Sequence, residues 1–100
     1  MKCLKICPLT KSVTQIEMDA SSILPALYVH IGCREVEAVF PSPQITLYVD
    51  AEGASPSGFR HPRLGIIRGV AVAFGPIDEN GADTSATVGA AALRDSIHWV

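Results

Sequence analysis

The stretch Leu64–Pro76, LGIIRGVAVAFGP, is the longest nearly unbroken apolar run in this chain. Apolar residues occupy both odd and even positions, so a strand here must be covered on both faces or lie centrally in a sheet. A helix is the competing interpretation, but the β-branched residues and Gly69 inside the run disfavour it. We therefore predict one buried central strand between Gly65 and Gly75, around which the other elements are arranged.

Four further segments alternate between apolar and polar residues, as half-buried strands do. They are Lys2–Cys7, Ser12–Met18, Arg34–Phe40 and Gln44–Asp50. The first two are close enough in sequence to pair as a hairpin. In the third, the pattern predicts a buried face made of Val36, Ala38 and Phe40.

A short helix is predicted between the second and third of these strands. Pro25 is tolerated only in a first helical turn, so the N-cap is Ser21 or Ser22, and Gly32 suits the residue that ends the helix. The spacing predicts one buried stripe, formed by Leu24, Leu27, Tyr28 and Ile31.

The remaining segments are turns, one irregular loop and a second helix. Asp50–Gly53 and Asn80-Gly81 have turn composition, whereas Ala54–Arg63 has no periodicity and is predicted to be a mobile or ligand-contacting loop. A C-terminal helix is expected over Ala86–Ile97, capped by Thr84 or Ser85. This order predicts a single α+β domain over residues 1–100, with an antiparallel or mixed sheet of about five strands and two helices packed on one face.

Composition excludes several classes of protein. The formal net charge is −2, so nothing indicates sequence-nonspecific DNA binding. No apolar segment approaches the ~20 residues that span a bilayer. The start of the chain lacks the apolar core and cleavage site of a signal peptide, and three cysteines are an odd number. We therefore expect Met1 to be the true start of a cytoplasmic protein, without a membrane association and with reduced thiols.

The sequence contains no pattern that places catalytic or metal-binding residues. Cys3 and Cys7 would lie about 13 Å apart on one face of a strand, at ~3.3 Å per residue, which is too far to share one zinc ion. No nucleophile elbow accompanies the serines, histidines or cysteines. We therefore predict no catalytic residue, no metal ligand and no cofactor.

One cluster of positive charge stands out. An anion pocket is predicted from its arginines, whose planar forks match phosphates and carboxylates, together with a histidine and a neighbouring aromatic ring. The residues are Phe59, Arg60, His61, Arg63 and Arg68. The alternative is a solvated loop in which the arginines pair with Glu35, Glu37 or Asp50.

Four segments, LPALYVHIGCREVEAVF, ITLYVDAEG, FRHPRL and IIRGVAVAFGPIDENG, resemble a small family of bacteriophage and mobile-element proteins known as a domain of unknown function. The family pattern has a helix ending in Leu-Gln-x-x-Val-Gly-Gly, an Ile-Glu strand, a Tyr-x-Asp-Glu-x-Gly turn, an Asn-Pro loop and a glycine-flanked strand. The chain departs from it at four positions: Tyr28 for Gln, Cys33 for the second Gly, Ala51 in the acidic turn and His61 for Asn. The resemblance implies a phage or plasmid accessory protein acting in the host cytoplasm.

Three functions stay open at this point. The favoured one is a non-enzymatic accessory protein that binds and inhibits a host protein or complex, such as an antiviral-defence complex. The second is a binder of a small anionic ligand, such as a nucleotide signal, through the basic cluster. The third is a small enzyme. Homodimerisation through an exposed strand edge is also open.

Overall fold

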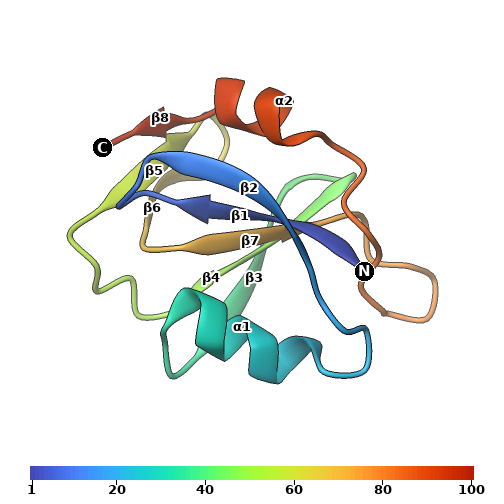
Figure 1. Ribbon diagram of the computed structural model, residues 1–100. Helices are drawn as coiled ribbons and strands as arrows, with labels where there is room; N and C mark the ends of the chain where they lie inside the picture. The colour runs from blue at the N-terminus through green and yellow to red at the C-terminus, as the bar shows by residue number, and fades with distance from the viewer.

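The computed structural model describes residues 1–100, which form a five-stranded antiparallel sheet, a three-stranded sheet and two helices (Figure 1). The first sheet has the spatial order β2 (Ser12–Glu17), β1 (Lys2–Cys7), β7 (Ala71–Phe74), β4 (Ile45–Asp50) and β3 (Val36–Ser42). The second has the order β6 (Gly65–Arg68), β5 (Gly58–His61) and β8 (His98–Trp99). The helices are α1 (Ile23–Ile31) and α2 (Ala90–Asp95). The predicted α+β class and five-stranded sheet are confirmed, whereas the second sheet was not predicted.

Strand β7 is the central strand that the apolar run predicts. It lies between β1 and β4 and is antiparallel to both, and all its residues are fully buried. Val72 and Phe74 pack on the side of α1, while Ala71 and Ala73 pack on the side of the second sheet and α2. This two-sided burial explains why the sequence of β7 shows no alternation.

The first half of the same run does not belong to this strand, so the prediction of one continuous strand is wrong. The chain turns at Gly69, whose φ is +92°, a conformation that favours glycine. The Gly69 N–H donates to the Ser57 carbonyl at 2.8 Å, which fixes the turn. Strand β6 therefore joins the second sheet as an edge strand, and its Ile66 is 44% exposed.

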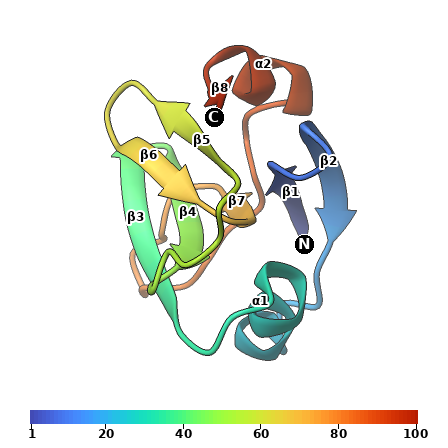
Figure 2. The same ribbon diagram turned by 90° about the vertical axis from the view of Figure 1, so that its left-hand side faces the viewer.

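The two helices lie on opposite sides of the five-stranded sheet, not on one face as predicted. Figures 1 and 2 show α1 on one side, with α2 and the three-stranded sheet on the other. Two separate hydrophobic clusters result: Leu27 and Ile31 of α1 belong to one, and Leu93 of α2 belongs to the other with Phe59. The physical reason is that the central strands are apolar on both faces, so both faces need a cover.

The predicted limits of α1 are confirmed, and those of the second helix are not. Ser22 is the N-cap of α1, and Gly32 follows its last residue with φ +71°. Helix α2 begins only at Ala90, because the segment before it is extended: Gly75 N–H donates to the Thr84 carbonyl, and Ala86 N–H donates to the Lys2 carbonyl. These bonds hold residues 84–86 alongside β1 and the end of β7, so the helix starts only after this segment.

Candidate functional site

The segment predicted to be an irregular loop contains strand β5, and this changes the role of Phe59. Phe59 is fully buried, and the strand register places it opposite Ile67 of β6 and Trp99 of β8. It packs in the same cluster as the residues of β7 that face the second sheet. Phe59 is therefore a core residue and cannot stack on a bound ligand.

His61 shapes the turn between β5 and β6. Its Nδ1 accepts a hydrogen bond from the Arg63 N–H at 3.1 Å. Burial, with the nearby Arg63 charge, lowers the pKa of His61 below its ordinary value of 6.5, so the ring is neutral at pH 7. An asparagine here, as in the family pattern, would accept the same hydrogen bond from the residue two positions on. The histidine thus serves the turn geometry.

Two of the predicted arginines share one surface, and the third does not. Arg60 and Arg68 are exposed and lie on the same face of the hairpin, since Arg60 is paired with Ile66, two residues before Arg68. His98 of β8 lies directly opposite Arg60 on that face. Arg63 lies in the turn between the strands. The sheet therefore brings together Arg60, Arg68 and His98, the last of which sequence patterns did not indicate.

None of these arginines pairs with a carboxylate, so the alternative of an ion-paired loop is wrong. The only ion pair in the structure joins the Met1 ammonium to Glu17 at 3.2 Å. Arg68 instead donates from its guanidinium to the Pro56 carbonyl at 2.9 Å.

A first groove of about 450 Å³ lies beside the turn at Gly69. Its lining residues come from the β1–β2 turn, the end of α1 and the loop before β5: Cys7, Pro8, Leu9, Ile31, Gly32, Asp50, Ala54, Ser55, Ser57, Gly69 and Val70. A hydrogen bond with Thr10 lowers the pKa of the Cys7 thiol, whereas burial raises the pKa of Cys3 to about 11. Cys7 is thus the thiol best placed to react.

A second groove, of about 370 Å³, runs along the N-terminal half of α1. Hydrophobic residues form seven of its eight lining positions: Met1, Ala20, Ile23, Leu24, Leu27, Tyr48 and Ala82, with Asp83 as the eighth. The Tyr48 hydroxyl donates to Asp83 at 2.7 Å, and burial together with this carboxylate raises the tyrosine pKa. Tyr48 therefore stays a neutral donor.

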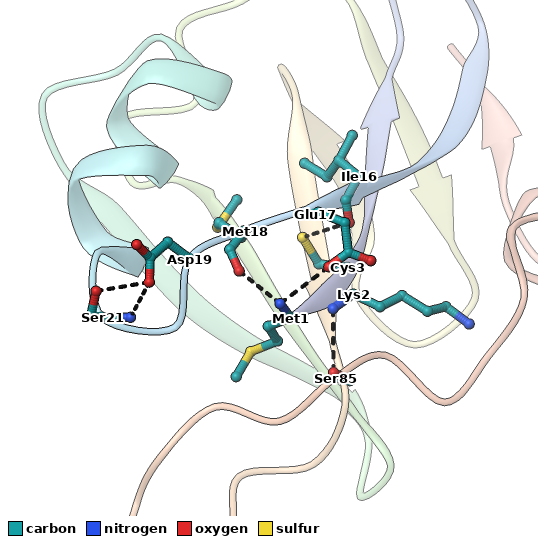
Figure 3. A network of polar contacts seen from close by, with 9 residues as sticks. All are labelled: Met1, Lys2, Cys3, Ile16, Glu17, Met18, Asp19, Ser21 and Ser85. Atoms are coloured by element: carbon teal, nitrogen blue, oxygen red, sulfur yellow. Dashed lines mark hydrogen bonds and ion pairs between the residues drawn. The ribbon is translucent and has the colours of Figure 1, made fainter.

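The walls of this second groove are held by polar contacts, which Figure 3 shows. The Met1 ammonium donates to the Met18 carbonyl at 2.8 Å and pairs with Glu17. The Asp19 carboxylate accepts from the N–H and the hydroxyl of Ser21, at 2.9 and 2.8 Å. These contacts fix the chain on either side of Ala20, so the groove is formed before any partner arrives.

Exposed apolar residues extend from this groove to the edge of the sheet. Tyr48 is paired with Ala38 of β3, and Phe40, which lies where the β3–β4 register becomes irregular after Val39, is 59% exposed. Leu24, on the groove wall, is 51% exposed. We call Leu24, Ala38, Phe40 and Tyr48, with the second groove, the open apolar patch.

The open apolar patch corrects two sequence expectations. Of the predicted buried face of β3, only Val36 packs into the core, while Ala38 and Phe40 are exposed. Of the predicted α1 stripe, Leu27 and Ile31 are buried and Tyr28 is only partly buried, while Leu24 is half-exposed. The reason for the exposure on β3 is the position of α1, which packs over β7 and β4 and not over the edge strand.

Neither groove is lined by any of the residues predicted to form an anion pocket. No three side chains of the metal-binding types are grouped to hold an ion. Neither helix has the length and apolar character required to cross a membrane.

No family model, curated protein or solved structure matches this chain, so its resemblance to the phage family stays a prediction.

Proposed function

We propose that this protein is a non-enzymatic binding protein that docks on a partner protein through the open apolar patch and inhibits the partner by occupying its surface. One observation carries the proposal: Leu24, on the wall of a groove that is almost wholly apolar, is 51% exposed, and Phe40, on the edge strand that pairs with the strand of Tyr48, is 59% exposed. Contiguous apolar surface of this kind on small domains commonly marks a contact site.

The groove can receive an apolar side chain of the partner, and such buried anchor side chains contribute most of the binding energy at protein interfaces. A leucine or phenylalanine side chain of the partner that becomes fully buried there would contribute about 1.5–3 kcal/mol. Leu24 and Phe40 would in turn pack against the partner around this anchor. A central pocket with an apolar surround is the usual arrangement of an interface hot spot.

The sequence resemblance supports a host factor as the partner, with an antiviral-defence complex as the leading class. Such a role needs occupancy and no chemistry. A preformed docking surface suits it, because little conformational entropy is lost on binding.

The test uses photo-crosslinking in host lysate, with a benzophenone amino acid placed at Leu24 or Phe40. The matched control places the same residue at Arg94, which is exposed on α2, on the other side of the sheet. We expect one host protein to be crosslinked from the two patch positions and not from the control. That protein should also lose its binding, by about tenfold or more, to a Leu24→Asp variant.

Equal crosslinking from Arg94, or unchanged binding of Leu24→Asp, would contradict the proposal. Self-association is a distinct outcome: a dimer in light scattering that Phe40→Ser converts to monomer would assign the patch to a second copy of this chain. Because both residues are already exposed, each variant should keep its unfolding free energy within about 0.5–1 kcal/mol of the parent.

A further inference from the structure

The charges of this chain are segregated. Residues 53–77 contain three arginines and no aspartate or glutamate. The whole chain has a formal net charge of −2, so with +3 in this segment the remaining residues carry −5. The three-stranded sheet, which takes two of its strands from this segment, is therefore a cationic layer on an otherwise acidic molecule.

The outer face of this sheet is defined by the strand register. Ile66, Arg60 and His98 lie side by side across β6, β5 and β8. Arg68 lies on β6 beside Gly58, and Val100 exchanges two hydrogen bonds with Gly58 on the other side. We call these five side chains, all exposed, the cationic face: Arg60, Ile66, Arg68, His98 and Val100.

The cationic face has a small energetic cost in the free protein. Arg60 and Arg68 are diagonal neighbours, about 7–8 Å apart by the geometry of an antiparallel pair. No carboxylate, including that of the chain terminus, lies within ion-pair distance of either. Like charges so placed repel one another weakly. Arg68 is held by its hydrogen bond to the Pro56 carbonyl, whereas the Arg60 side chain has no hydrogen bond or ion pair in the structure.

We propose that the cationic face binds an acidic segment of a partner protein, in which carboxylates alternate with apolar side chains. The arginine forks would donate paired hydrogen bonds to carboxylates, in the bidentate geometry for which they are suited. Arg68 is already oriented by its bond to the Pro56 carbonyl and keeps its other N–H groups free. Ile66 and Val100 offer apolar contacts between the charges.

Two other anionic ligands fit this face less well. Single-stranded nucleic acid is held by exposed aromatic rings, but Phe59 and Trp99 point to the opposite, inner side of the sheet. A free phosphate or nucleotide is usually enclosed in a pocket, and neither groove reaches these residues. The proposal is independent of the open apolar patch, since the two surfaces share no residue.

The test is fluorescence anisotropy with a labelled peptide of alternating glutamate and leucine, at low and moderate salt. We expect binding that Arg60→Gln/Arg68→Gln weakens by about tenfold or more. The matched control, Arg34→Gln/Arg94→Gln, removes two arginines that are equally exposed but lie elsewhere, and should bind within about twofold of the parent. The photo-crosslinks from Leu24 should persist in both variants, which separates this test from that of the open apolar patch.

Three results would overturn the proposal. The first is the same loss in both double variants, which would mean a non-specific charge effect. The second is stronger binding of a labelled oligothymidylate or of inorganic phosphate than of the peptide, which would assign the face to a phosphate ligand. The third is no binding of the peptide by a parent protein shown to be folded by its cooperative unfolding.

Discussion

Strands β6 and β7 come from the same apolar run but differ in their burial and in their hydrogen bonding. β7 is hydrogen-bonded on both sides and fully buried, whereas β6 is an edge strand that exposes most of its residues. The two are separated by Gly69, whose φ of +92° turns the chain from one sheet to the other. The comparison teaches that hydrophobicity alone does not determine burial. One backbone conformation in the middle of a run can divide it into a core strand and a surface strand.

The largest effect should come from side chains that fill the core of β7. Phe74→Ala removes a fully buried ring and should lower the free energy of unfolding by about 3–5 kcal/mol. Ile66→Ala in β6, at 44% exposure, should cost less than about 1.5 kcal/mol. Urea denaturation of both variants measures the difference. Equal losses of unfolding free energy would mean that β6 and β7 contribute alike to the core.

The reactivities of Cys3 and Cys7 should differ in the same way, because Cys3 packs against the buried strand β7 and Cys7 lies at a surface groove. Cys3 packs with Val72 and Phe74 of β7, while Cys7 lies in the groove beside Gly69. With a pKa of about 11 for Cys3 and a lowered pKa for Cys7, the thiolate fractions at pH 7 should differ by about 100-fold or more. Iodoacetamide labelling followed by mass spectrometry should modify Cys7 first and Cys3 last. If Cys3 in the folded protein is labelled at a rate similar to that of Cys7, the core around Val72 and Phe74 is accessible to the reagent, against our expectation.

Gly69 itself can be tested directly. Gly69→Ala should destabilise the fold by about 1–3 kcal/mol, because an L side chain is strained at its φ of +92°. The added Cβ would meet only Ser55 Cβ at 3.5 Å, an ordinary contact, so the loss would report backbone strain and not a clash. Gly89→Ala is the control: its φ is −82° and the space is open, and although alanine is a poorer N-cap for α2 than glycine, stability should change by less than about 1 kcal/mol. A neutral Gly69→Ala would mean that the turn does not depend on glycine.

The smallest expected effect concerns His61, at the turn between β5 and β6. The pKa of His61 is lowered in the fold, so the unfolded chain binds more protons as pH falls through 6.5. Stability should therefore decline between about pH 7 and pH 5, and His30, whose pKa is also lowered, contributes in the same direction. His61→Asn should preserve the turn and make the decline shallower. If urea denaturation gives His61→Asn the same dependence of stability on pH as the parent, His61 does not titrate in this way.

Much of the fold could be predicted because short-range rules decide it. Alternation located β1 and β2, and Pro25 and Gly32 set the limits of α1. The split at Gly69 could not be derived, because a glycine inside an apolar run is compatible with a continuous strand until its φ is known. The late start of helix α2 could not be derived for a similar reason: Ala86 N–H is bonded to Lys2 at the other end of the chain, and Gly75 N–H is bonded to the Thr84 carbonyl across a loop, and no local pattern indicates either bond.

The candidate surfaces were predicted only in part. Arg60 and Arg68 were identified from sequence because charge clustering is visible there, but His98 joins them only through the pairing of β8 with β5. The prediction that Phe59 lies in a loop and lines an anion pocket is wrong, since a four-residue strand is too short to show alternation in the sequence. The exposure of Phe40 depends on which strands α1 packs over, and no local sequence pattern indicates this.

Residue-resolved amide hydrogen exchange distinguishes the core strand from the edge strand without any substitution. We expect the amides of Ala71–Phe74 to exchange slowest, at rates set by global unfolding, and those of Gly65–Arg68 to exchange much faster through local opening of the edge strand. Equal protection of the two segments would contradict the division of the apolar run into a core strand and a surface strand.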